Sequence, residues 1–192
     1  GTALRENVNG TDLFPLLCEA ASQTGLSIFL LGARPGIAEA TANNMMQRFP
    51  ELRIAGARDG YFTTEDEPAV VAEINDSGAA ILLVAFGVPR QELWIASRRN
   101  ELKTPVCLGV GGLFDFYSGR IARAPVWMRE IGLEWVWRML QEPKRMWRRY
   151  IIGNPLFLSR VWRQMRHPER FPLIVRAAGK ATAASSTLGD SK

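Results

Sequence analysis

Polar side chains follow two apolar runs of this chain, in segments rich in glycine and proline. In the first segment Phe86 and Gly87 are followed by Pro89, Gln91 and Glu92. Glycine lets the backbone approach a ligand closely, and proline, which has no N–H, is tolerated where a helix begins. Gln91 and Glu92 then fall in the first turn of a helix, where their polar groups can face a ligand. The alternative, that the side chain only complements the helix dipole, applies to Glu92 more than to the uncharged Gln91.

The second segment ends an apolar run at residues 105–110 and continues through Gly111 and Gly112 to Asp115. Its paired glycines would leave backbone N–H groups free for a ligand, and the Asp115 carboxylate could accept a hydrogen bond from a sugar or ribose hydroxyl. Capping of the next turn explains Asp115 equally well. In open α/β sheets ligands bind beyond the carboxyl ends of the strands. Both segments therefore predict a ligand site at one edge of a sheet.

Other motifs are weaker candidates for a functional site. The loop from Gly32 to Gly36 joins an expected strand to an expected helix, whose first turn could hold an anion. Its spacing fits neither the dinucleotide fingerprint nor a phosphate loop with its lysine, so a plain turn is the more common explanation. The single histidine, His167, has no carboxylate partner in a recognisable frame. The sequence therefore predicts neither a Ser-His-Asp triad nor a metal site.

The elements that must position these residues alternate along the chain. Apolar residues recur with a helical period in some segments, and short continuous apolar runs indicate buried strands in others. This order predicts an α/β fold with a Rossmann-like, mostly parallel sheet, right-handed crossovers and helices on both faces. From residue 125 onward the pattern is helical only, which predicts a helical C-terminal appendage. The expected helices are residues 11–23, 35–49, 68–77 and 89–100, and the expected strands are residues 26–31, 52–55, 79–86 and 105–110.

Positive charge is concentrated in the appendage. The net charge of the 192 residues is +5, and residues 138–170 alone hold nine Lys and Arg against two Asp and Glu, with tryptophan interleaved. Arginine suits phosphate, and tryptophan suits membrane interfaces. Arg138, Arg145 and Arg148 share one face if their helix is continuous. A solvated helical face is the simpler alternative, although few acidic residues interrupt the run. No apolar stretch is long enough to span a bilayer.

These motifs together resemble the WecG/TagA/CpsF family of bacterial glycosyltransferases over about residues 8–164. Several pieces occur in the right order, which makes the resemblance specific, and Gly10 with Asp12 and residues 60–62 fit as well. Asn7 and Asn9 depart from the family, which usually has Arg and Thr at these positions. The pieces that carry the resemblance are Gly-x-Pro-x-Gln-Glu at residues 87–92, Gly-Gly-x-Phe-Asp at 111–115, Arg-Ala-Pro at 123–125, and Gly-Leu-Glu-Trp at 132–135 with Arg138.

The resemblance implies an inverting glycosyltransferase with an α/β fold and a helical appendage. Family members transfer a sugar, commonly N-acetylmannosamine or its uronic acid, from a UDP-linked donor to a polyprenyl-diphosphate-linked saccharide. Their products are intermediates of teichoic acid, enterobacterial common antigen or exopolysaccharide. The family's proposed base is an Asp in a further N-terminal portion, so we expect the base to lie ahead of Gly1. The resemblance implies no cofactor and no metal.

The resemblance also implies how the chain is divided into domains and where the protein meets its partners. We expect an α/β nucleotide-sugar-binding domain at residues 1–128, a basic membrane-proximal appendage at 129–170 and a disordered tail at 171–192. Cys18 and Cys107 have no metal-binding spacing and are expected to be buried free thiols of a reducing compartment. The protein would act in the cytoplasm, peripherally on the anionic inner face of the cell membrane, without nucleic acid. Whether it forms a homo-oligomer is left open.

The site residues follow from the motifs. Arg138, Arg145 and Arg148 would offset the charge of a diphosphate or contact the membrane surface. The alternatives are a nucleotide- or nucleic-acid-binding module without catalysis and a membrane-surface scaffold, although no recognised nucleic-acid motif is present. The residues expected to bind substrate are Gly10, Gly32, Phe86, Gly87, Pro89, Gln91, Glu92, Gly111, Gly112, Asp115 and Arg123.

Overall fold

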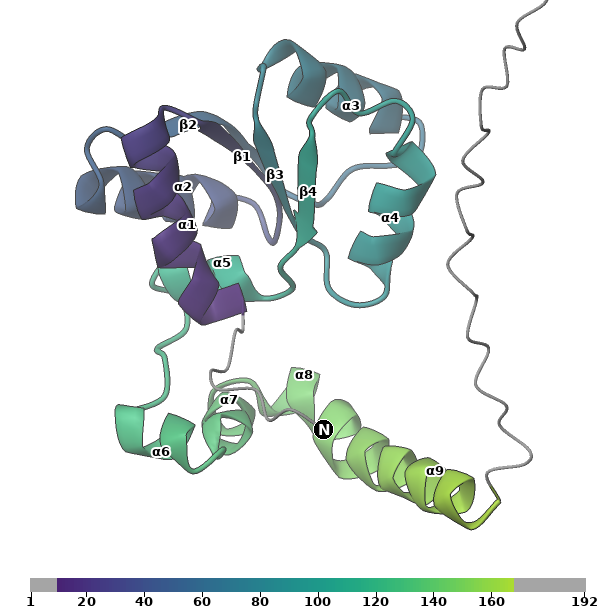
Figure 1. The fold of residues 1–192 in the computed structure, drawn as a ribbon. Helices are drawn as coiled ribbons and strands as arrows, with labels where there is room; N and C mark the ends of the chain where they lie inside the picture. Colours follow the sequence, from purple (N-terminus) through teal and green to yellow (C-terminus); the bar gives the residue numbers. More distant parts are fainter. Residues whose placement is uncertain (1–9, 168–192) are drawn as a thin grey trace, which may run out of the picture. The chain divides into compact units, whose positions relative to one another are not determined.

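Four parallel strands in the order β2-β1-β3-β4 form the sheet of this fold, which confirms the expected architecture. The computed structural model describes residues 10–167, and the chain divides after Ile131 into two compact units. The sheet belongs to the first unit (Figure 1). Its strands are β1 at Ser27–Gly32, β2 at Arg53–Arg58, β3 at Ile81–Ala85 and β4 at Val106–Gly109.

Helices cover both faces of the sheet because the central strands are apolar on both sides (Figure 1). In β1, Ile28 and Leu30 pack against α1, α2 and α5, whereas Phe29 and Leu31 pack against α3 and α4. This alternation follows from the two-residue period of a strand. The helices are α1 at Gly10–Thr24, α2 at Ile37–Arg48, α3 at Glu67–Asp76, α4 at Arg90–Arg98 and α5 at Leu113–Tyr117.

The strand order reverses between β1 and β3. From β1 the chain passes to β2 on one side, and it then returns to β3 on the other side of β1. The carboxyl ends of these two neighbours lie level, since Gly32 is paired with Ala85. A Cβ atom at Gly32 would lie 2.7 Å from the carbonyl carbon of Ala85, so only glycine permits this approach. Open α/β sheets bind ligands at such a reversal point.

Two local features of the first unit differ from the sequence-based expectation. Helix α2 begins at Ile37 and not at Pro35, because Gly36 adopts a left-handed conformation with φ of 81°. Helix α5 was not expected at all, since five residues are too few to reveal a helical period. Contacts distant in sequence hold it in place: Leu113 and Phe114 are buried in the core with residues of α2, and the Thr41 hydroxyl lies 3.1 Å from the carbonyl oxygen of Phe114.

The region after the sheet is helical, as expected, but it is interrupted. The backbone of Glu142 leaves the helical conformation just before Pro143, and the next helix begins there. Arg138, Arg145 and Arg148 therefore do not lie on one continuous helix, which removes the reason for their shared face. The elements are α6 at Val126–Glu130 in the first unit and, in the second, α7 at Glu134–Gln141, α8 at Pro143–Trp147, a π-helix at Arg148–Gly153 and α9 at Asn154–Arg166.

Some expectations fall outside the described part of the chain. The side chains of Arg145 and Arg148 are not described, and neither is the tail at residues 171–192. Within residues 10–167, no helix combines the length and the apolar character needed to cross a membrane. Cys18 is buried and Cys107 is partly buried, and both are free thiols.

Candidate functional site

The carboxyl ends of β1, β3 and β4 bring three glycine-containing loops to one edge of the sheet. The loop after β1 is tied to β3, because the N–H of Ala33 donates to the carbonyl oxygen of Ala85 at 3.0 Å. The loop after β4 is tied to β3 in the same way, through the N–H of Val110 and the carbonyl oxygen of Val84 at 2.9 Å. The expected ligand segments at residues 86–92 and 109–115 therefore lie next to each other.

Gln91 connects two of these loops from inside the fold. Its side chain is only 3% exposed, and its amide oxygen accepts hydrogen bonds from the N–H of Gly87 at 3.2 Å and of Gly111 at 2.8 Å. The N–H of Gly111, which was expected to be free for a ligand, is therefore used within the protein. The sequence indicated that Gln91 is important but could not identify these partners, since Gly111 is distant along the chain.

Gly109 provides the space that Gln91 occupies. A Cβ atom at position 109 would lie 2.6 Å from Nε2 of Gln91, which is too close for any real contact. Gly109 was not among the expected site residues. Its place in the glycine-rich run before Asp115 was the only sequence signal that could have identified it.

Glu92 is the polar group that this arrangement presents outward. The side chain of Glu92 is exposed, and its Oε1 atom accepts a hydrogen bond of 2.8 Å from Nε2 of Gln91. It lies in the first turn of α4, where a carboxylate is also stabilised by the helix dipole. The two roles are compatible, because the dipole acts on the charge whichever way the carboxylate is oriented.

Aromatic and arginine side chains support the loop after β3. Phe86 packs edge-to-face against Phe62 and Trp94, with ring centroids 5.7 and 5.6 Å apart. The guanidinium of Arg90 lies 4.8 Å from the centre of the Phe86 ring. Phe86 is partly buried and is held in place by these neighbours. Pro89 precedes α4 and does not belong to it, and the Val88–Pro89 peptide bond is cis.

Asp115 is almost completely buried and forms an ion pair. Its Oδ1 atom accepts a hydrogen bond of 2.8 Å from Nε of Arg120, and its backbone oxygen accepts one of 2.9 Å from the N–H of Ile121. The residue is 4% exposed, whereas the Arg120 side chain is 26% exposed. The carboxylate therefore organises the turn after α5, and Gly112 immediately precedes that helix.

Arg123 belongs to a second charged cluster at the start of α1. Its Nη2 atom pairs with Oδ1 of Asp12, and Nη1 of Arg129 lies 3.9 Å from the same oxygen. Two guanidinium groups thus share one carboxylate, which leaves the three side chains with a net positive charge. Within residues 10–167, the buried Nε atoms of Arg123 and Arg129 have no hydrogen-bond acceptor.

The hydroxyl of Tyr117 donates to the carbonyl oxygen of Thr11 at 2.6 Å and so ties α5 to α1.

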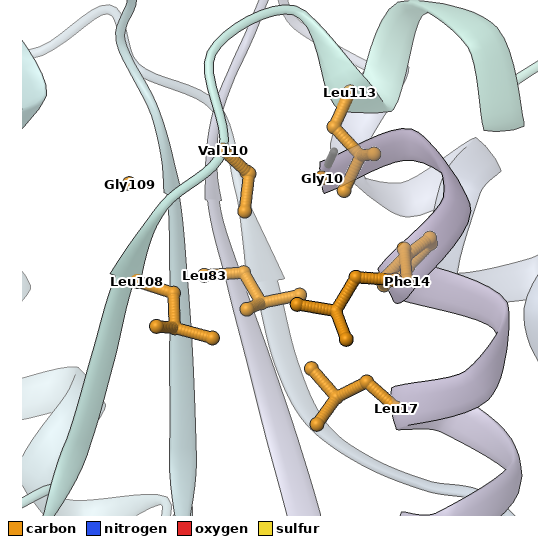
Figure 2. Close-up of a pocket in the computed structure, with 9 residues that line it drawn as sticks. Gly10, Phe14, Leu17, Leu83, Leu108, Gly109, Val110 and Leu113 are labelled. Atoms are coloured by element: carbon orange, nitrogen blue, oxygen red, sulfur yellow. The ribbon is translucent and has the colours of Figure 1, made fainter. Parts of the chain in front are cut away.

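An apolar pocket of about 220 Å³ lies between α1 and the edge strand β4. Figure 2 shows Phe14 and Leu17 of α1 opposite Leu83 of β3 and Leu108 of β4. Gly10, an expected substrate residue, lines one end of this pocket, near Val110 and Leu113. The lining offers no charged side chain, so the pocket suits an apolar group and not a phosphate or a sugar.

The structure thus gathers most of the expected site residues at one edge of the first unit. Gly32 ends β1, Gly87 and Gly111 lie in the loops after β3 and β4, and Gln91 and Glu92 lie in the first turn of α4. Asp115 lies in α5, and Arg123 lies in the segment between α5 and α6. Arg138 belongs to the second unit. In the described part of the chain, no group of three or more His, Cys, Asp or Glu side chains could hold a metal ion.

The comparison with known families agrees with these motifs. The family model described as "Glycosyl transferase WecG/TagA/CpsF family" matches residues 1–171. Members of that family are glycosyltransferases of cell-surface polysaccharide biosynthesis. The match covers both the sheet and the helices that follow it.

Proposed function

We propose a specific reaction for this chain, which belongs to the WecG/TagA/CpsF family of glycosyltransferases. The chain transfers an N-acetylmannosamine-like sugar, or a related hexose or uronic acid, from a UDP-linked donor. The acceptor is a saccharide linked to a polyprenyl diphosphate, and the anomeric configuration is inverted. In such a reaction a carboxylate removes the proton of the acceptor hydroxyl while the UDP group leaves.

The convergence of loops at the carboxyl edge of the sheet carries this proposal. The nucleotide sugar binds beyond the strands that end at Ala85 and Gly109, next to the reversal point between β1 and β3. This is the usual place for a nucleotide in an open α/β sheet. The loops there are rich in glycine, so that the backbone can approach the donor closely.

The leaving diphosphate needs positive charge or N–H donors. Arg123 and Arg129 suit this need, because they share the single carboxylate of Asp12 and their Nε donors lack acceptors in the described chain. In the second unit, Arg138, Arg145 and Arg148 offset the diphosphate of the lipid acceptor. The protein works peripherally at the inner face of the cell membrane, because the family acts on membrane-linked acceptors.

Donor binding and transfer are tested separately. Calorimetry with the purified protein should give a clearly higher affinity for UDP than for ADP. The conservative variant Asp115→Asn should weaken UDP-sugar binding, because it disturbs the ion pair with Arg120 that organises the turn after α5. The matched control is Asp76→Asn at the end of α3, an exposed residue at the opposite edge of the sheet. Thermal melting of each variant establishes that it is folded at the assay temperature.

Transfer is measured with a synthetic polyprenyl-diphosphate saccharide and a panel of UDP-sugars, and NMR of the product gives the anomeric configuration. Retention of configuration would contradict the inverting mechanism. Equal affinity for UDP and ADP would contradict a site that selects a UDP-linked donor, and unchanged UDP-sugar binding in Asp115→Asn would contradict its place at this edge of the sheet. Tight UDP binding without transfer to any acceptor, in a protein that also contains the family's proposed base, would favour a nucleotide-binding module that has no catalytic role.

A further inference from the structure

We infer that Gln91 is a positioning residue that joins the loops after β3 and β4 and orients the carboxylate of Glu92 toward the hydroxyl groups of the donor's sugar. The identity of this ligand rests on the proposed function. The arrangement of Gln91, Gly87, Gly111 and Glu92 comes from the structure alone.

The hydrogen-bonding capacity of Gln91 is largely used inside the protein. An amide oxygen has two lone pairs, and both are taken by the N–H groups of Gly87 and Gly111. The amide nitrogen donates to Glu92 at 2.8 Å. Since the side chain is 3% exposed, a ligand outside the loops has no access to it. Gln91 therefore affects a ligand only through the groups that it holds.

Gln91 affects a ligand through the carboxylate of Glu92, which it holds. A carboxylate accepts about four hydrogen bonds, and Gln91 occupies one position on Oε1, so that acceptor capacity remains on the exposed side chain. A carboxylate beside a diphosphate would be repelled, whereas sugar hydroxyls are donors that it accepts well. The sugar is therefore the part of the donor that this side chain suits.

Gly109 gives a steric test of the same connection. A methyl group at position 109 would lie 2.6 Å from Nε2 of Gln91 and would displace the amide without changing any polar group. Gly109→Ala should therefore reproduce the effects of Gln91→Leu, which removes all three hydrogen bonds.

Substitutions separate the two roles of Gln91, which are to join the loops through Gly87 and Gly111 and to orient the carboxylate of Glu92. Gln91→Glu keeps an oxygen that accepts from both glycine N–H groups, but it loses the donor to Glu92 and places two like charges side by side. Glu92→Ala removes only the outward carboxylate. The double variant Gln91→Glu/Glu92→Gln exchanges the groups, so that the amide at 92 donates to the carboxylate at 91. The matched control is Gln47→Leu, an exposed glutamine on α2.

The first measurement is hydrogen exchange at the amides of Gly87 and Gly111, without any ligand. Both amides should exchange faster in Gln91→Leu and Gly109→Ala, and they should keep their protection in Gln91→Glu and Gln47→Leu. Unchanged exchange in Gln91→Leu would overturn the connection between the loops, whatever the donor is.

The second measurement compares the affinities for UDP and for the UDP-sugar. Glu92→Ala and Gln91→Glu should lower the UDP-sugar affinity about tenfold, as expected for a lost hydrogen bond to a charged group, and should leave the UDP affinity nearly unchanged. Gln91→Leu should weaken both ligands. The double variant should recover part of the UDP-sugar affinity, which a purely structural role of Gln91 would not produce.

The outcomes are distinguishable. An equal loss of UDP and UDP-sugar affinity in Glu92→Ala would indicate a ribose contact and overturn the assignment to the sugar. The absence of rescue in the double variant would overturn the orienting role of Gln91. If the unmodified protein bound no UDP-sugar, the proposed function and the role of Glu92 would fail together, while the exchange data would still decide the connection between the loops.

Discussion

Cys18 lies on the inner face of α1 with no exposed surface. Burial raises the pKa of its thiol from about 9 to about 12, and the positive charge of Arg48 only partly opposes this. Burial likewise raises the pKa of the Tyr117 hydroxyl. Both groups are neutral when protonated, so the fold favours the protonated form of each.

The stability of the protein should therefore decrease in alkaline solution. Between pH 9 and about 12 the unfolded chain loses the Cys18 proton while the folded chain keeps it, so unfolding is favoured as the pH rises. The free energy of unfolding should fall by up to ~1.4 kcal/mol per pH unit from this group. Urea unfolding followed by circular dichroism from pH 8 to 11 measures the slope.

Cys18→Ala should reduce this slope. The control is Cys107→Ala, because burial also raises the pKa of Cys107 but its thiol is only partly buried. Identical slopes in the unmodified protein and in Cys18→Ala would show that the thiol is not the cause.

Residue types near the site could be predicted from the sequence, but their partners could not. Gln91, Glu92 and Asp115 stood out because polar groups follow apolar runs. Gln91 and Asp115 have partners that are distant in sequence or belong to a short turn, namely Gly111 for Gln91 and Arg120 for Asp115. One sequence carries no signal for such pairs, because the fold alone brings them together.

At the scale of elements, the contact between β1 and β3 depends on Gly32. Its backbone has φ of 125°, and the neighbouring strand leaves no room for a side chain. The sequence predicted Gly32 as a substrate-binding residue, and the structure gives it a packing role against β3. The loop after β1 also meets the loop after β2, because the N–H of Gly60 donates to Ala33 at 3.0 Å.

Gly32→Ala should destabilise the protein by roughly 1–3 kcal/mol or more, since overpacking and an unfavourable φ act together. Gly10→Ala is the matched control, because a Cβ there would meet nothing within 4 Å. Chemical denaturation of both variants checks this prediction. A loss of equal size in the two would mean that the contact with Ala85 does not limit position 32.

The order of strands and helices was predictable because each central strand is apolar on both faces and each long helix has a clear period. Element ends were less predictable: β2 begins at Arg53 and continues to Arg58, where the sequence suggested only residues 52–55. Gly56, Ala57 and Arg58 are half-buried and are not strongly apolar, so hydrophobicity alone does not mark them. The interruption of the helix at Glu142 became evident only from the backbone conformation in the structure.

At the scale of the whole molecule, charge separates the two parts of the chain. Residues 1–137 hold 12 Lys and Arg against 16 Asp and Glu, whereas residues 138–170 carry a net +7. Within α9, Leu158, Trp162 and Met165 are exposed and share one side, opposite the basic residues Arg160 and Arg163. A basic amphipathic helix of this kind suits the headgroup plane of a membrane.

Truncation after Trp137 should release the protein from anionic vesicles, while nucleotide binding partly survives. Each Lys or Arg near an anionic surface contributes about 1 kcal/mol, and salt screens this attraction. The full chain should sediment with anionic vesicles more strongly at low salt and should not bind neutral vesicles through charge. If the truncated chain still sedimented with anionic vesicles at physiological salt, the membrane role of residues 138–170 would be wrong.

The contact between Gln91 and Gly109 has an evolutionary consequence. A side chain at 109 would displace the amide of a glutamine at 91 from its hydrogen bonds, since a Cβ would come within 2.6 Å of Nε2. The two positions should therefore change together among descendants of a common ancestor. Lineages that keep glutamine at 91 should keep glycine at 109, and a lineage that gains a side chain at 109 should first have acquired a shorter residue at 91.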